Sequence, residues 1–236
     1  MKIGGLQKLS LIDYPGKLSA VVFTFGCNFK CGFFHNPELV LPEKISFIDE
    51  NSVLEFLLQR KKYLDCVCIT GGEPLINKDI EDFLYKIKNL GLLIKIDTNG
   101  SNPELLKRLI ERKLVDFTAM DIKSGKENYN IVTDEEIDVS KIEESIKIIA
   151  NSGVEYELRT TVVPGIHSID EVISIGEWVF SFLKKRAKRY VLQNFVPREN
   201  KMINKKLEKV ESFDSKILEN MKNAVEDYFE EVKIRS

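Results

Sequence analysis

The chain has 236 residues, enough for one substantial hydrophobic core. Hydrophobic residues make up 43% of the sequence and charged residues 31%, which is typical of a folded protein and excludes a disordered one. The formal net charge is −2, from 35 basic and 37 acidic side chains, and it gives no sign of a nucleic-acid or membrane partner. Residues 1–5 do not lead into a signal-peptide-like apolar stretch, so we expect a cytoplasmic protein.

Short apolar segments alternate with longer amphipathic ones along the chain. The apolar segments are bounded by Gly, Asn, Asp or Pro, which favours buried strands over helices. They cover residues 20–25, 66–70, 92–97, 115–120, 155–163 and 190–195. Between them, apolar residues at helical spacing predict helices around 80–87, 142–149 and 217–228.

Two helix starts carry their own signals. Asn102 followed by Pro103 predicts a capped helix with proline in its first turn. Ser168 and Glu171 have the spacing of a capping box. Strand–helix alternation with continuous apolar strands predicts a parallel sheet covered by helices, and either an open, partial barrel or a doubly wound sheet satisfies the pattern.

The loop after the first predicted strand holds Cys27 and Cys31, with three residues between them. Chemistry in parallel α/β folds lies in such loops, at the carboxyl ends of the strands. On spacing alone, the two thiols are either ligands of one metal centre or reduced cysteines without a ligand role. A zinc site would need further ligands, and the sequence has only two histidines, His35 and His167. We expect His167 to be a solvated loop residue.

The sequence around these cysteines resembles that of the radical S-adenosylmethionine (SAM) superfamily. The cysteine motif of that superfamily has three residues between its first and second cysteines and two between its second and third. Cys27 and Cys31 match the first two positions, Phe33 matches the aromatic residue that usually precedes the third cysteine, and the third position holds Phe34. Residues 4–16 and 35–39 extend the likeness, which covers nearly the whole chain. The chain is most similar in this respect to the activating protein of anaerobic ribonucleoside-triphosphate reductase, a glycyl-radical enzyme activating enzyme.

The resemblance implies a partial (β/α)6 barrel of the radical SAM type. It also implies a single domain over residues 1–236, with an N-terminal extension over 1–18 and a C-terminal helical closure over about 205–236.

In the enzymes that this chain resembles, three thiolates hold a [4Fe–4S] cluster whose fourth iron binds SAM. A phenylalanine ring has no lone pair with which to replace a thiolate, so we expect Phe34 to leave the cluster labile or unformed. His35 is no replacement, because the family pattern has histidine there beside an intact third cysteine. Cys66 and Cys68 share one face of the next strand, and we expect both to be small core residues.

Gly71, Gly72, Glu73 and Pro74 follow the second predicted strand. Taken alone, they are consistent with an ordinary turn before a helix. By resemblance, they hold the methionine part of SAM, with Glu73 beside the ammonium group and the glycines allowing close backbone approach.

The later strand ends also carry polar residues. By resemblance, Asp97, Thr98 and Asp121 help to bind SAM, with a monovalent cation in some of these enzymes, and Asn99 and Lys123 lie nearby. Arg159 needs a partner inside an apolar strand, and either SAM or a structural ion pair provides one. Gln193 either reaches the adenosine or caps the barrel end. With Phe33, Phe34 and His35, these residues complete the expected cofactor surface.

The resemblance implies that an electron from a flavodoxin- or ferredoxin-like donor passes through the cluster and cleaves SAM. The resulting 5′-deoxyadenosyl radical then takes a hydrogen from a glycine of the partner enzyme. Three alternatives stay open at this point. They are a catalytically silent SAM-fold binding protein, a radical SAM enzyme acting on a small molecule, and a zinc or redox-sensing module built on Cys27 and Cys31.

Overall fold

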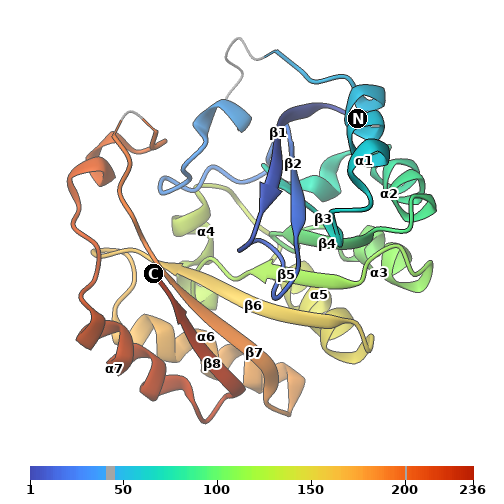
Figure 1. Cartoon of the computed structure of the whole chain (residues 1–236). Coiled ribbons are helices and arrows are strands. Elements are labelled where there is room, and N and C mark those ends of the chain that lie inside the picture. The colour runs from blue at the N-terminus through green and yellow to red at the C-terminus, as the bar shows by residue number, and fades with distance from the viewer. Residues whose placement is uncertain (41–45, 200) are drawn as a thin grey trace. The chain divides into compact units, whose positions relative to one another are not determined.

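The structure, a computed structural model, describes residues 1–40, 46–199 and 201–236, in which strands and helices alternate (Figure 1). The strands are β1 (Ile3–Ser10), β2 (Ser19–Thr24), β3 (Cys66–Gly71), β4 (Leu93–Thr98), β5 (Phe117–Asp121), β6 (Glu155–Val162), β7 (Ala187–Asn194) and β8 (Phe229–Arg235). The helices are α1 (Glu50–Arg60), α2 (Ile80–Asn89), α3 (Pro103–Glu111), α4 (Tyr129–Thr133), α5 (Val139–Asn151), α6 (Ile169–Leu183) and α7 (Ser215–Val225).

The strands form a mostly parallel sheet in chain order, from β1 to β8. Strand β1 pairs antiparallel with β2, whereas β2–β3–β4 and β6–β7–β8 pair in parallel. The six predicted strands correspond to β2–β7, which confirms the expected parallel α/β fold. The sequence pattern did not predict the two edge strands, β1 and β8.

The chain divides into two compact units. The first unit comprises Met1–Asn28, Glu38–Thr98 and Asn102–Ala119, and the second comprises Phe29–Pro37, Asn99–Ser101 and Met120–Ser236. The two are described separately below.

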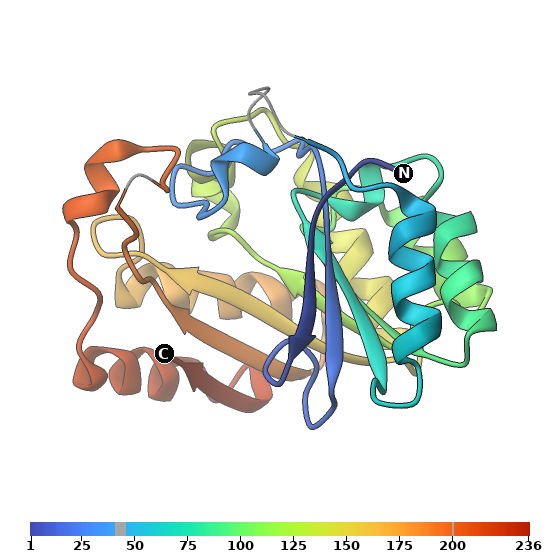
Figure 2. The same cartoon turned by 45° about the horizontal axis from the view of Figure 1, so that its top comes forward.

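In the first unit, two strands form the centre of the core. The side chains of Ala20–Val22 in β2 and Cys66–Ile69 in β3 are completely buried, which explains their unbroken apolar sequence. Helix α2 buries its predicted apolar stripe and packs on β4, beside α1 (Figure 2). Helix α3 begins as predicted, since the Asn102 side chain accepts a hydrogen bond from the Leu105 amide at 3.2 Å, with Pro103 next.

In the second unit, α6 begins at the predicted cap, because the Ser168 hydroxyl accepts a hydrogen bond from the Glu171 amide at 3.1 Å. The other half of the capping box does not form. Instead, the Glu171 carboxylate accepts hydrogen bonds from the Ser124 hydroxyl, the Gly125 amide at 2.7 Å and Asn128 Nδ2 at 2.7 Å. Glu171 therefore ties the loop after β5 to α6.

The C-terminal part of the second unit is not wholly helical. A short 3₁₀ turn over Lys205–Lys209 and helix α7 occupy the region where helical closure was expected. The chain then continues into β8, which pairs with β7 from Ala187↔Phe229 to Gln193↔Arg235. Its exposed residues, Glu230 and Lys233, are both charged, as is usual for a strand at the edge of a sheet.

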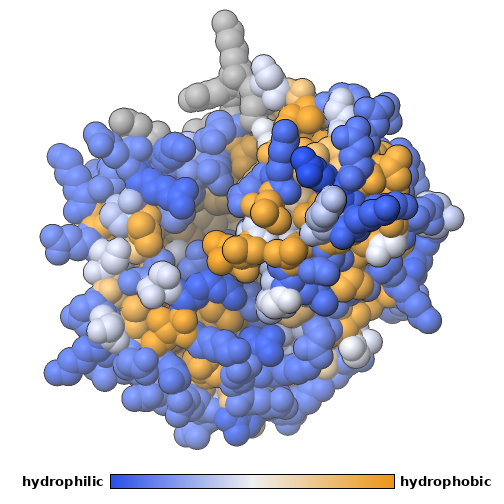
Figure 3. Space-filling model, in the orientation of Figure 1, coloured by the Kyte–Doolittle hydropathy of each residue, from blue (hydrophilic) through white to orange (hydrophobic). Residues whose placement is uncertain are grey.

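Within the described ranges, no helix is both long and apolar enough to cross a membrane. The face seen in Figure 3 carries mainly hydrophilic side chains with apolar ones between them.

Candidate functional site

The start of the cysteine loop is fixed by backbone hydrogen bonds in the first unit. The Gly26 amide donates to the carbonyl oxygen of Leu39 at 2.7 Å, and Gly26 adopts a φ of 95°, in the left-handed region that favours glycine. Cys27 follows at once and is partly exposed. The end of β2 and this turn therefore determine where the first cysteine lies.

The glycine motif after β3 is fastened to the same turn. The Gly72 amide donates to the carbonyl oxygen of Thr24 at 3.0 Å, and the Glu73 amide donates to that of Gly26 at 2.8 Å. A Cβ on Gly72 would lie 1.9 Å from the Gly26 oxygen and 3.2 Å from the Cys27 nitrogen. A Cβ on Gly71 would lie 2.3 Å from the Thr24 nitrogen, and φ there is 122°. Both glycines are thus required by backbone contact, and they bring the motif beside Cys27.

The Glu73 carboxylate is buried, with 1% exposure, and holds the motif to the end of β4. Its Oε1 accepts hydrogen bonds from the Leu75 amide at 3.0 Å and from the Thr98 hydroxyl at 2.7 Å. Pro74 begins the short 3₁₀ turn that the carboxylate caps. Thr98 and Glu73, which were both predicted to bind SAM, are therefore in direct contact. The role of Glu73 beside the SAM ammonium group stays a prediction.

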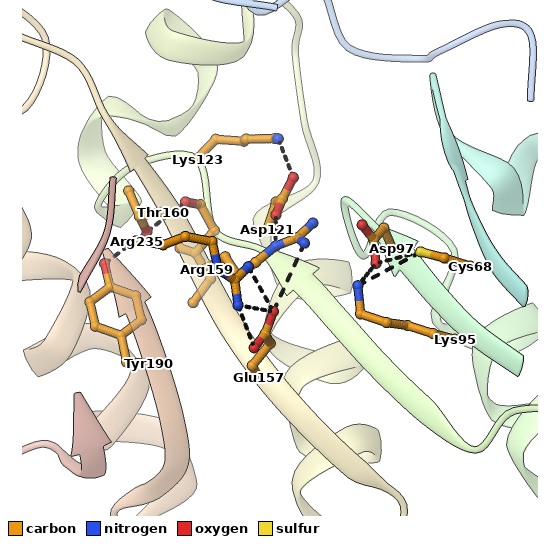
Figure 4. A network of polar contacts seen from close by, with 11 residues as sticks. Cys68, Lys95, Asp97, Asp121, Lys123, Glu157, Arg159, Thr160, Tyr190 and Arg235 are labelled. Carbon is orange, nitrogen blue, oxygen red and sulfur yellow. Dashed lines mark hydrogen bonds and ion pairs between the residues drawn. The ribbon is translucent and has the colours of Figure 1, made fainter. Parts of the chain in front are cut away.

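Asp97, also at the end of β4, is paired with Lys95, a residue that the sequence pattern did not single out (Figure 4). Cys68 Sγ lies 3.7 Å from Asp97 Oδ1 and 3.8 Å from Lys95 Nζ. Cys66 is completely buried and donates to the Leu18 carbonyl oxygen at 3.6 Å, and burial raises the pKa of its thiol to about 12. Cys66 and Cys68 are thus buried core residues, as expected.

In the second unit, Asp121 at the end of β5 lies between two basic groups (Figure 4). Its Oδ2 is 2.9 Å from Lys123 Nζ and its Oδ1 accepts from Arg159 Nε at 2.8 Å. Burial alone would raise the pKa of Asp121, but Arg159 and Lys123 outweigh it and hold the pKa well below its usual range. Arg159 thus forms an ion pair with Asp121, which is one of the two kinds of partner expected for it, and a contact with SAM stays a prediction. Three of the predicted residues come together here.

The sequence pattern missed other members of this polar network. Arg235 of β8 places both terminal nitrogens 3.3 Å from the carboxylate of Glu157, which is 2% exposed. Tyr190 donates to the Thr160 hydroxyl at 2.7 Å, and that hydroxyl donates to the Ile122 carbonyl oxygen at 2.8 Å. The sequence did contain one sign that Glu157 belongs to this network. Glu157 and Arg159 are two residues apart, which puts both on one face of a strand.

The rest of the cysteine motif belongs to the second unit. Cys31 is 6% exposed and burial raises the pKa of its thiol, while its carbonyl oxygen accepts from the Phe34 amide at 3.0 Å. Phe33 is also buried and its ring centroid lies 6.3 Å from that of His167. His35 lies beside Phe195, at 5.9 Å between ring centroids, and its buried Nε2 has no hydrogen-bond partner among the described residues.

His167 is not the solvated residue that we expected. It is 2% exposed, its Nδ1 accepts from the Val163 amide at 3.1 Å, and its Nε2 lies 2.9 Å from the Lys123 carbonyl oxygen. This pattern requires a neutral ring with the proton on Nε2. Burial lowers the pKa of His167 and the surrounding hydrogen bonds offset only part of the effect. The histidine ties the loop after β6 to the loop after β5.

The two remaining predicted residues carry amides. Asn99 is 5% exposed and its Oδ1 accepts from the Ser101 amide at 2.9 Å, which closes the turn after β4. Gln193 is half-buried in β7, opposite Thr161 of β6 and Arg235 of β8. The place of Asn99 on the cofactor surface and the role of Gln193, toward the adenosine or as a cap of the barrel end, stay predictions.

Comparison with known proteins identifies the family. The Radical SAM superfamily matches residues 21–178, a span that includes the cysteine loop and the glycine motif. The chain belongs to this superfamily. It is similar to MJ1227 of Methanocaldococcus jannaschii, a proposed glycyl-radical enzyme activating enzyme, with 34% identity over 84% of this chain and 81% of that protein. It also resembles the pyruvate formate-lyase-activating enzyme of Clostridium pasteurianum, with 28% identity over 73% of each chain.

Solved structures support the radical SAM fold. SuiB of Streptococcus suis, bound to S-adenosylmethionine, has a TM-score of 0.70 with 17% identity. The match covers 92% of this chain and 50% of SuiB, so this radical SAM protein spans about half the length of that relative. The anSMEcpe structure with bound AdoMet has a TM-score of 0.61 with 18% identity, over 90% of this chain and 62% of that one.

The superfamily implies a [4Fe–4S] cluster and SAM, and the residues present can be tested against the cluster. The motif offers the thiols of Cys27 and Cys31, while Phe34 has no donor atom. Among the described residues, no three His, Cys, Asp or Glu side chains are grouped so that they could hold a metal ion. The donor set therefore does not fit a cluster held by three thiolates.

The close approach at Gly72 generates a stability prediction. In Gly72→Ala, the new methyl group meets the Gly26 oxygen, and we expect a loss of about 1–3 kcal/mol from the forced backbone shift. Gly5→Ala is a matched control in the same unit, because its Cβ would lie 3.4 Å from the Phe23 side chain. Thermal melting by circular dichroism should show a lower melting temperature for Gly72→Ala alone. Equal melting of the two variants would contradict the contact.

The buried ring of His167 generates a pH prediction. Its native pKa lies below the ordinary 6.5, so the unfolded chain takes up the proton first as the pH falls. The stability that His167 contributes is therefore present above pH 6.5 and is lost as the pH falls through the native pKa. We expect NMR titration to give a pKa below 6.5 for His167, with His35→Gln assigning the two ring signals.

The same prediction has a thermodynamic readout. The free energy of unfolding should fall more steeply from pH 7.5 to pH 5.5 in the unchanged chain than in His167→Gln. Parallel curves for the two proteins would show that His167 is not buried as the neutral ring.

Proposed function

We propose that this radical SAM protein is an activase of a glycyl-radical enzyme, and that the partner is anaerobic ribonucleoside-triphosphate reductase. The observation that carries the proposal is the similarity to glycyl-radical activating enzymes over most of the chain. The reductase is favoured over pyruvate formate-lyase by the residues around the cysteines, especially 4–16 and 35–39. We further propose that residues 1–236 act as one domain in the cytoplasm, with a flavodoxin- or ferredoxin-like electron donor.

The first unit supports SAM binding through the rigid glycine motif. Because Gly71 and Gly72 touch the backbone of the cysteine loop, the amides and carbonyls around them are held in one arrangement. A preorganised backbone loop binds a ligand without first losing conformational freedom. The proposed ligand of this loop is the methionine part of SAM.

The second unit supports a peptide substrate. A groove of about 730 Å³ runs from Gly32, the neighbour of Cys31, past Ile131, Gly165 and Asn204. Lys30, Asp134 and Lys205 add charges to its wall, and the Ile131 side chain is 77% exposed. A groove with both apolar and charged walls suits an extended peptide segment, and in the proposed partner that segment is the glycine loop.

Phe34 determines how well this sequence is expected to hold the iron–sulfur cluster. With thiolates only at Cys27 and Cys31, we propose that this sequence holds the cluster poorly and makes little or no radical. A catalytically silent protein that binds SAM or the reductase is the second candidate, and Phe34 is the observation that favours it.

The first test is formation of 5′-deoxyadenosine after anaerobic iron–sulfur reconstitution and reduction in the presence of SAM. We expect the product from Phe34→Cys and at least a tenfold lower yield, or none, from the unchanged chain, because the third thiolate is restored only in the variant. Phe33→Cys is a matched control that adds a thiol at the neighbouring position. Silence of Phe34→Cys with a verified fold and cluster content would overturn the enzymatic proposal and favour the silent binding protein.

The partner has a separate test. We expect reduced, reconstituted Phe34→Cys with SAM to generate a glycyl-radical signal in electron paramagnetic resonance when anaerobic ribonucleotide reductase is added. Pyruvate formate-lyase, added instead, should stay without the signal. A radical in pyruvate formate-lyase alone would keep the activase class and overturn the choice of partner.

A further inference from the structure

Lys95 is a buried lysine in the first unit, with a side chain only 2% exposed. Its ammonium group is paired with Oδ1 of Asp97, whose side chain is 11% exposed, and lies 3.8 Å from Cys68 Sγ. The same nitrogen lies 5.9 Å from the centroid of the Phe117 ring. Figure 4 shows the ammonium directed at the carboxylate and the sulfur. A positive charge is thus held inside the sheet at the end of β4.

The strands themselves build this arrangement. Lys95 and Asp97 are two residues apart on β4 and so share one face. Cys68 of β3 lies directly opposite Lys95 in the parallel register, and its small side chain leaves room for the long lysine side chain. The position of the ammonium is therefore set by the register of two buried strands and not by a flexible surface side chain.

We propose that the Lys95 ammonium supplies the positive charge that Asp97 requires, so that this strand end takes part in SAM binding without an inorganic monovalent cation. A carboxylate with little exposure to water is stable only beside a positive group. A second cation on Asp97 would lie close to the ammonium, in a poorly solvated place where like charges repel strongly. Lys95 is thus a positioning residue that holds Asp97 ionised and oriented.

The second unit follows the same rule at Asp121. That carboxylate, the other one for which the resemblance implied a cation, has the Lys123 ammonium at 2.9 Å and the Arg159 guanidinium at 2.8 Å. Each acidic strand end thus has a basic partner from its own unit. The inference rests on the proposed function, since it concerns how SAM is bound.

The test measures the SAM dissociation constant by isothermal titration calorimetry in two media of equal ionic strength. One contains sodium or potassium chloride, and the other contains tetramethylammonium chloride, whose cation is too large for a carboxylate site. Reconstituted protein is used, both unchanged and as Phe34→Cys. We expect the dissociation constant to differ by less than twofold between the media.

Variants locate the effect at Lys95. Lys95→Met removes the charge at similar length, and we expect SAM binding to weaken at least tenfold in tetramethylammonium and to recover on addition of sodium or potassium. Loss through misfolding would not be rescued by a small cation. Lys88→Met is the matched control, because Lys88 pairs with Asp116 at 2.9 Å in the same unit, outside the predicted cofactor residues. It should bind SAM equally in both media.

The outcomes separate the inference from the proposed function. SAM binding by the unchanged protein or Phe34→Cys that requires sodium or potassium would overturn the inference and leave the activase proposal intact. Equal, cation-independent binding by a folded Lys95→Met would also overturn the role of Lys95. No SAM binding in either medium, by unchanged protein and Phe34→Cys alike, would overturn the proposed function and with it the inference. If Lys95→Met does not fold, the comparison of media in the unchanged protein decides.

Discussion

The candidate site of the first unit depends on a close approach of two backbones. The loop after β3 lies so near the turn after β2 that a single methyl group on Gly72 would meet the Gly26 oxygen at 1.9 Å. Two amide hydrogen bonds, from Gly72 and Glu73, hold the loops together. These bonds join the start of the cysteine loop, as far as Cys27, to the glycine motif, and the Glu73 carboxylate joins the motif to the end of β4. A ligand at this edge would meet groups that are already in place, which lowers the entropic cost of binding.

The second constraint is that each buried acidic side chain in a strand needs a basic partner. The sequence indicates only some of these pairs. Acidic residues at strand ends, such as Asp97 and Asp121, are visible as breaks in apolar runs. Lys123 and Arg159, the partners of Asp121, are also singled out by the sequence, but Lys95, the partner of Asp97, is not. The pair Glu157–Arg235 is missed as well, because it joins strands far apart in the sequence. Strand register and the topology of the sheet decide these contacts, and neither can be read from a local pattern.

The parallel core could be predicted because fully buried strands have unbroken apolar sequences and because caps such as Asn102 mark helix starts. The edge strands β1 and β8 were not predicted, because neither has an unbroken apolar sequence. Each has a neighbouring strand on one side only, and its exposed positions carry lysine, glutamate and glutamine, with Leu9 of β1 as the one apolar residue among them. The prediction that His167 is solvated was wrong for a related reason. Loop histidines are usually hydrated, and only the contact between two loops, which the sequence does not specify, removes this one from water.

Phe34 separates two properties that usually occur together in a family, namely the backbone arrangement of the cysteine loop and its ability to hold the cluster. The backbone around it needs no cysteine side chain, since the Phe34 amide reaches the Cys31 carbonyl oxygen at 3.0 Å whatever the side chain is. The hydrogen bonds and glycine contacts of the first unit are equally independent of position 34, so the loop proposed to bind SAM can persist without the third thiolate. Cluster ligation has no such tolerance, because it requires a donor atom at that position and an aromatic ring has none. A phenylalanine at position 34 can therefore leave the backbone of the loop intact while removing the electron path that the proposed chemistry requires.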